Sequence, residues 1–155
     1  MNSFSSKIAI VTGGGSGIGK AVAARLVKAG GSVVIGGRDE AKLKQAAADI
    51  DPTGTRVRHY AGDIAQPATA TGLVNLATEA FGGVDILINN AGVFRPKAFL
   101  DVDESEYDWF LDTILKGNAD LSVSAVIADA AEAVVAGSSR NGAIVMKRQM
   151  SFAEA

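Results

Sequence analysis

The residues with the clearest chemical potential form a glycine-rich turn near the N-terminus. Positions 12–19 have the pattern T-G-x-x-x-G-x-G, preceded by the apolar run 8–11 and followed by Val22 and Leu26 at helical spacing. This order predicts a buried strand, a tight turn and a helix. The unpaired N–H groups and positive dipole end of a helix N-terminus bind anions. The turn therefore predicts a pyrophosphate site, with these candidate residues: Gly13, Gly15, Ser16, Gly17, Ile18 and Gly19.

The same turn has a second interpretation, as a flexible linker, because Gly-Gly-Gly-Ser-Gly is typical linker composition. A linker has no reason to lie between a buried strand and an amphipathic helix, so this context favours the anion site. The spacing also differs from the common dinucleotide fingerprint, since G-x-G-x-x-G cannot be laid on residues 13–19.

Composition limits the kind of protein that could carry this turn. A chain of 155 residues, 48% of them hydrophobic, has the size and the core of a single domain over residues 1–155. A net charge of -2 argues against nucleic acid as a partner. Without cysteine the chain has no disulfide, thiol nucleophile or thiolate metal site. The short apolar run after Lys7 predicts neither a signal peptide nor a membrane anchor, so we expect a cytoplasmic protein.

The elements that must position the turn alternate between strands and helices. Apolar runs and helical periodicity predict three further strands and two further helices in the order βαβαβαβ, which implies a parallel sheet with helices on both faces. The strands are expected at 32–36, 56–60 and 84–88, and the helices at 39–50 and around 73–81. The weak apolar character of 56–60 indicates an edge strand. The predicted fold is thus a doubly wound, Rossmann-like α/β sheet.

The second half of the chain is expected to be one long helix followed by a fifth strand. Asp103-x-x-Glu106 is typical of a capping box, which explains the local acidic residues better than a metal site does. An apolar stripe then continues to Val135, with a kink near Gly117. A loop at 137–142 leads to a strand at 143–146, where the predicted sheet of about five strands ends.

Several motifs together resemble the short-chain dehydrogenase/reductase family. Its cofactor loop is T-G-x-x-x-G-x-G, and Leu115-Lys116-Gly117 is similar to part of its N-L-x-G motif. The resemblance implies a nicotinamide cofactor and a small carbonyl or alcohol substrate, together with a homo-oligomer. It also implies two further groups of cofactor-binding residues: Asp63 and Ile64 at the adenine, and Asn90, Ala91 and Gly92, from the N-N-A-G motif, beside the ribose.

The type of cofactor is indicated by Arg38. Enzymes of this fold that use NAD place an acid at the end of the second strand, where this chain has Gly37. An arginine beside it can bind a 2′-phosphate with two charge-assisted hydrogen bonds, so we expect NADP(H) to be preferred, with NAD(H) possible as well. The alternative is that Arg38 is an ordinary solvated residue paired with Asp39.

The catalytic residues that the family uses are absent. The family works with Asn, Ser, Tyr and Lys, the last two in Tyr-x-x-x-Lys, but the tyrosines here are followed four positions later by Ile64 and Leu111. Ile114 stands in place of the catalytic Asn, and Ser151 lies two positions too late to match the Ser. The single histidine, His59, lacks the serine and acid partners of a nucleophile relay and is expected to be structural.

Two hypotheses follow from this mixture of present and absent motifs. In the first, the chain is an incomplete NADP(H)-dependent oxidoreductase that binds its cofactor but is inactive alone. In the second, it is a dinucleotide-binding module without turnover that acts as a regulator or an interaction partner. The abrupt departure from the family after Val145 favours the first hypothesis.

Overall fold

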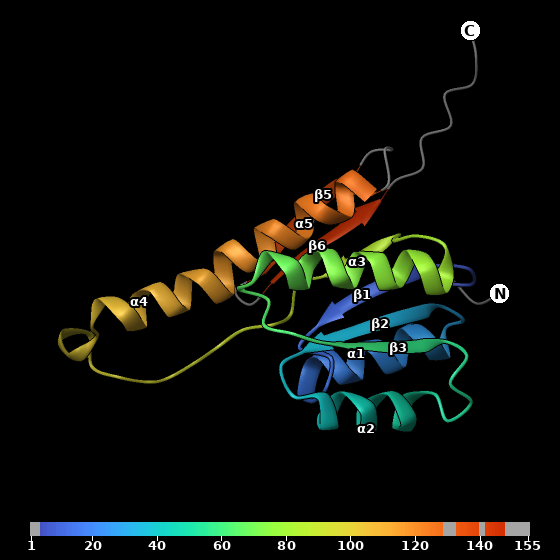
Figure 1. Ribbon diagram of the computed structural model, residues 1–155, viewed down its shortest axis with the longest axis horizontal. Coiled ribbons are helices and arrows are strands. Elements are labelled where there is room, and N and C mark those ends of the chain that lie inside the picture. The colour runs from blue at the N-terminus through green and yellow to red at the C-terminus, as the bar shows by residue number, and fades with distance from the viewer. Residues whose placement is uncertain (1–3, 129–132, 140–141, 148–155) are drawn as a thin grey trace, which may run out of the picture.

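A single sheet forms the centre of the computed structural model, which describes residues 4–128, 133–139 and 142–147. Helices lie on either side of it (Figure 1). In chain order the main elements are β1 (Ile8–Thr12), α1 (Gly17–Lys28), β2 (Ser32–Gly37), α2 (Glu40–Ile50), β3 (Val57–Ala61), α3 (Pro67–Phe81), β4 (Ile86–Ile88), α4 (Glu104–Leu111), α5 (Gly117–Ala128), β5 (Ala133–Ser139) and β6 (Gly142–Lys147). The strand order is β3-β2-β1-β4-β6-β5.

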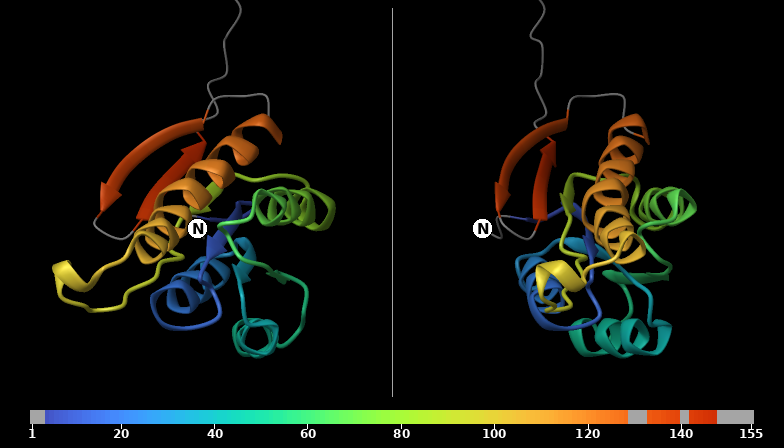
Figure 2. Two further views of the ribbon diagram at one scale, coloured as in Figure 1. Left: turned by 60° about the vertical axis from the view of Figure 1, so that its left-hand side comes forward. Right: turned by 90° about the vertical axis from the view of Figure 1, so that its left-hand side faces the viewer.

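The first four strands are parallel and their side chains alternate between two hydrophobic layers. Ile10 of β1 packs on one face in a cluster with residues of α3 and α5, whereas Ala9 and Val11 pack on the other with residues of α1 and α2. Figure 2 shows α3 and α5 side by side, away from α1 and α2. Helices on both faces confirm the predicted doubly wound architecture, and β3 is an edge strand, as expected.

The predicted helix starts at Asp39 and Asp103 are confirmed by capping hydrogen bonds, whereas the helix expected around 73–81 begins earlier, at Pro67. The carboxylate of Asp39 accepts a hydrogen bond from the backbone N–H of Lys42 at the start of α2, and Asp103 accepts one from Glu106 N at the start of α4. Only half of the expected capping box forms, because the Glu106 side chain turns away toward Arg95 and Lys97.

The irregularity in the long helix lies just before Gly117, where the sequence predicted a kink. A π-helical segment, Asp112–Lys116, joins α4 to α5, and the N–H of Gly117 donates to the carbonyl of Asp112, five residues back. Gly117 then begins α5 against the segment that follows β3: a Cβ at this position would collide with the carbonyl oxygen of Ile64. The close approach of two backbones therefore explains the glycine, and the π-helical turn accommodates it.

The prediction that this helix continues to Val135 is wrong. α5 ends at Ala128, and Ala133–Ser139 forms β5, which also takes up part of the expected loop at 137–142. Short apolar runs are ambiguous between helix and strand, and the β-branched pair Val134-Val135 fits a pleated strand at least as well. Of the expected loop, residues 140–141 lie outside the described part.

The predicted fifth strand exists as β6, but its direction is wrong. It pairs antiparallel with both β4 and β5, whereas the βα rhythm predicted a parallel strand. A parallel neighbour needs a crossover of about a dozen residues or more, and the short connection from β5 permits only an antiparallel partner. β5 also covers β6, so residues 143–146 are not the sheet edge that the sequence predicts.

No helix in the described ranges is both long and apolar enough to span a membrane.

A buried carboxylate fixes the connection from α2 to β3. Asp51 accepts hydrogen bonds from the backbone N–H groups of Arg56 at 2.6 Å and Val57 at 3.3 Å, and from the hydroxyl and N–H of Thr53. Burial raises the pKa of Asp51, but these hydrogen bonds outweigh it and the pKa is lowered overall. The ionised form therefore stabilises the turn that leads into β3.

We expect Asp51→Asn to lower the free energy of unfolding at pH 7 by about 1–3 kcal/mol, because an amide cannot accept all of these hydrogen bonds. Because the pKa of Asp51 is lower in the folded protein, its stabilising contribution is fully present above about pH 4, its pKa in the unfolded chain. The contribution is lost as the pH falls through its pKa in the folded protein. Denaturant unfolding from pH 7 downward should show the difference between the two proteins shrinking. Asp101→Asn, at an exposed carboxylate, is the control. A difference independent of pH would contradict this account.

Candidate functional site

The glycine turn after β1 is joined to the end of β4 by a set of hydrogen bonds. The buried Thr12 hydroxyl accepts from the backbone N–H groups of Asn90 at 3.0 Å and Ala91 at 2.9 Å. The Asn90 amide in turn donates to the Thr12 carbonyl at 3.0 Å. Gly19 packs beneath this contact, where a Cβ would collide with the carbonyl of Gly13 and lie 2.6 Å from the Asn90 amide nitrogen. The two predicted glycine motifs are therefore parts of one structure.

The N-terminus of α1 lies beside the contact between Thr12 and Asn90, and no side chain of the described residues caps it. Ser16 is the N-cap residue, but its side chain makes no capping hydrogen bond, and the first turn of α1 contains no acidic residue. Helix N-termini of this kind attract anions through the unpaired N–H groups and the dipole. The local geometry fits the pyrophosphate site that the sequence predicts.

A cavity of about 520 Å³ opens at the carboxyl ends of the parallel strands. In open α/β sheets this edge, at the point where the strand order reverses, is where ligands bind. Ten of the twelve predicted residues line the cavity: Gly13, Ser16, Gly17, Ile18, Arg38, Asp63, Ile64, Asn90, Ala91 and Gly92. Gly15 and Gly19 do not line it; Gly15 lies against Leu43 of α2 and Gly19 supports the turn from below.

One end of the cavity carries its two ionisable side chains. Asp63 follows β3, and its carboxylate accepts a hydrogen bond from the N–H of Ala65 at 3.1 Å, which fixes its orientation. Arg38 follows β2, is exposed, and makes no ion pair with any described residue. The alternative pairing with Asp39 is absent because that carboxylate caps α2 and lies 3.4 Å from the Lys42 ammonium. The backbone hydrogen bond from Lys42 holds the pKa of Asp39 below its usual value.

The rest of the cavity wall is formed by the loop after β4, the π-helical segment and the start of α5. Phe94, Thr113, Ile114 and Asn118 lie there. The Asn118 amide donates to the Ile114 carbonyl at 2.6 Å, and its oxygen is buried without a partner among the described residues. This part of the wall combines Phe94 and Ile114 with two uncharged polar residues, and it differs from the Arg38 and Asp63 part in having no ionisable side chain.

Several lining residues were missed by sequence reasoning. Thr12 could have been found, because it is the first residue of the T-G-x-x-x-G-x-G pattern. Phe94 could have been found as well, because it lies two positions after the predicted Gly92. Thr113 and Asn118 carry no local signal, since only the packing of the π-helical segment and α5 brings them to the cavity.

The cavity has binding groups but few groups that could move a proton. Among its described lining residues only Arg38 and Asp63 are ionisable. The tyrosines Tyr60 and Tyr107 and the histidine His59 do not line it, and Ser151 lies outside the described residues. Within the described ranges, no three His, Cys, Asp or Glu side chains gather as a metal site would require. The arrangement is suited to holding a phosphorylated ligand.

Comparisons with known proteins agree with this geometry. The family model for short chain dehydrogenases matches residues 7–152. The (2S)-[(R)-hydroxy(phenyl)methyl]succinyl-CoA dehydrogenase subunit BbsD of Thauera aromatica is 36% identical over 111 residues, which are 72% of this chain and 45% of that protein. An uncharacterized oxidoreductase of Staphylococcus aureus strain MW2 is 36% identical over 117 residues, covering 76% of this chain and 50% of the relative. The chain thus spans about half the length of the curated relatives it matches.

Solved structures show the same relationship. A short-chain dehydrogenase/reductase described as a glucose/ribitol dehydrogenase from Brucella melitensis superposes with a TM-score of 0.78 and 28% identity, covering 81% of this chain and 52% of that one. L-Sorbose reductase from Gluconobacter frateurii, solved in complex with NADPH and L-sorbose, gives a TM-score of 0.75 and 30% identity, covering 80% of this chain and 48% of the reductase. Sequence motifs, sheet topology and these matches together show that the chain belongs to the short-chain dehydrogenase family.

Proposed function

We propose that this chain is the NADP(H)-binding part of a short-chain dehydrogenase-type oxidoreductase, whose reaction is hydride transfer between a nicotinamide cofactor and a carbonyl or alcohol. The observation that carries the proposal is the cavity between the open N-terminus of α1 and the exposed Arg38. An N-terminus with unpaired N–H groups suits the pyrophosphate, and a guanidinium without an ion pair to described residues suits the 2′-phosphate.

The fit to a dinucleotide extends along the whole cavity. Asp63, held by the Ala65 N–H, offers a carboxylate oxygen to an adenine amino group, while Asn90, Ala91 and Gly92 face the region between β1 and β4 where a ribose would lie. The neighbouring L-sorbose reductase structure contains NADPH, which supports the same class of cofactor here. When bound, the cofactor supplies the hydride; the chain's own residues bind and orient it.

A second candidate function is a cofactor-binding module that acts through protein contacts. The observation in its favour is a series of exposed apolar side chains on α4, the π-helical segment and α5: Tyr107, Leu111, Leu115 and Val123. Large apolar side chains gathered on one part of a surface mark interaction sites. This surface is compatible with a homo-oligomer in either candidate function.

The cofactor preference is tested by calorimetry with NADPH and NADH. We expect NADPH to bind more tightly, and Arg38→Ala to lose about tenfold or more for NADPH and little for NADH, since a charged hydrogen bond contributes roughly 1.5–3 kcal/mol. Arg25→Ala, which removes another exposed arginine at the far end of α1, is the matched control. Equal affinities in the unchanged protein would refute the preference.

Turnover by this chain alone is expected to be absent. Hydride transfer to a carbonyl leaves an alkoxide that must be protonated, and a positioned acid contributes roughly 10²- to 10⁴-fold. At the Phe94 and Ile114 end of the cavity no described residue can donate that proton. NADPH consumption with a panel of ketones and quinones is the assay, with Ser151→Ala as the control. Robust turnover that survives repurification would show that the proposal is wrong on this point.

Self-association is expected through the apolar series on α4 to α5. Leu115 is 65% exposed, so Leu115→Glu should shift the protein toward monomer without changing its fold. Asn75→Glu adds the same charge at an exposed position of α3 and should leave association unchanged. Light scattering over a range of concentrations makes the measurement. A monomer at every concentration, before any substitution, would contradict the expectation.

A further inference from the structure

The segment 93–98 carries an aromatic side chain to the mouth of the cavity. It leaves β4 after the N-N-A-G motif and runs without helix or strand toward a 3₁₀ turn, Phe99–Asp101. Phe94 lines the cavity while remaining 87% exposed. An exposed ring on an irregular segment needs some other contact to hold it in place.

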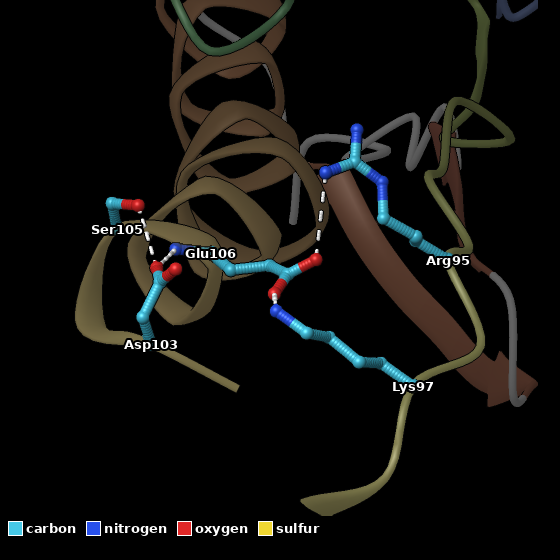
Figure 3. Close-up of polar contacts among 5 residues, drawn as sticks. All are labelled: Arg95, Lys97, Asp103, Ser105 and Glu106. Atoms are coloured by element: carbon cyan, nitrogen blue, oxygen red, sulfur yellow. Dashed lines mark hydrogen bonds and ion pairs between the residues drawn. The ribbon is translucent and has the colours of Figure 1, made fainter. Parts of the chain in front are cut away.

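That contact is a buried carboxylate on α4. Glu106 is only 7% exposed, and Figure 3 shows the two cationic side chains of the segment converging on it. Lys97 Nζ donates to one carboxylate oxygen at 2.7 Å, and Arg95 Nη1 lies 3.4 Å from the other. The Arg95 guanidinium also stacks 5.0 Å from the ring centre of Trp109, one helical turn further along α4. We call Arg95, Lys97, Glu106 and Trp109 the α4 clamp.

Capping of α4 does not account for the ion pairs of the Glu106 side chain. Asp103 already caps α4 through the Glu106 N–H, as the left side of Figure 3 shows, so the Glu106 side chain is not needed for that purpose. A buried carboxylate is costly unless it is paired, and both of its partners come from the segment that carries Phe94. The pairing therefore fixes the backbone on the far side of Phe94, while the N-N-A-G motif fixes the near side.

We propose that the α4 clamp is a positioning device that holds Phe94 against the nicotinamide ring of the bound cofactor. This inference rests on the proposed function, because it uses the direction in which the dinucleotide lies. Arg38 and Asp63 mark the adenylate end at β2 and β3, so the nicotinamide lies at the opposite end, where Phe94 follows β4. Aromatic rings stack with one another in offset or tilted arrangements, and nicotinamide is such a ring.

The test compares two probes by calorimetry: NADPH, and 2′-phospho-ADP-ribose, which lacks the nicotinamide. Phe94→Ala is expected to weaken NADPH binding roughly 3- to 10-fold and to leave 2′-phospho-ADP-ribose unchanged, with Phe94→Tyr close to the unchanged protein. Glu106→Gln should give the same selective loss, and should also shift the fluorescence of Trp109, the only tryptophan in the chain, because Arg95 is no longer held over it. Glu104→Gln, an exposed glutamate on the same helix, is the matched control.

Each outcome separates the inference from the proposed function. If the unchanged protein binds neither probe, the proposed function fails and the inference with it. If it binds both but Phe94→Ala leaves NADPH binding intact, or weakens both probes equally, the cofactor site stands and the role of the clamp is overturned. Because Phe94 is exposed, its substitution decides the question even if Glu106→Gln does not fold.

Discussion

The structure depends most on the hydrogen bonds that tie the end of β1 to the end of β4. One buried hydroxyl, that of Thr12, accepts two backbone N–H groups, and one amide, that of Asn90, donates back. Both chain segments would otherwise leave unpaired polar groups at a buried turn, at a cost of about 1–3 kcal/mol each. The α1 N-terminus, the glycine turn and the loop after β4 keep their relative positions because of this contact, and together they form one part of the cavity wall.

The cavity is asymmetric, and its asymmetry follows from which elements reach each end. The ends of β2 and β3 are followed at once by short polar connections, so Arg38 and Asp63 stand beside the sheet with their charges accessible. Gly117 packs closely on the backbone of Ile64, and this contact brings Ile114 and Asn118 into the wall, while Phe94 reaches it from the loop after β4. A ligand that is highly charged at one end and aromatic at the other matches this distribution better than a uniformly polar ligand does.

The sequence predicted most of the fold because the first four strands are short apolar or β-branched runs, the first three helices have a clear helical period, and glycine, proline or capping residues separate them. The second half was harder for identifiable reasons. Val134 and Val135 satisfy helical spacing by chance, while their β-branched side chains suit the strand they form. The direction of β6 follows from its short connection to β5, and the assignment of residues 133–135 to a helix hid that connection. In the site, motif residues were predictable, whereas Thr113 and Asn118 reach the cavity through tertiary packing alone.

Binding a dinucleotide and transferring a proton place different physical requirements on a dehydrogenase. Holding a dinucleotide requires backbone geometry: open N–H groups, close approach at Gly19, and a sheet edge where strand order reverses. Residues 12–92, which contain the first helices and most of the parallel strands, provide all of these features. Proton transfer instead requires a particular side chain with a suitable pKa at a fixed distance from the reacting atom. Among the described residues that line the cavity only Arg38 and Asp63 are ionisable, so the part of the wall formed by Phe94 and Ile114 meets the geometric requirement for a ligand surface without contributing an ionisable side chain.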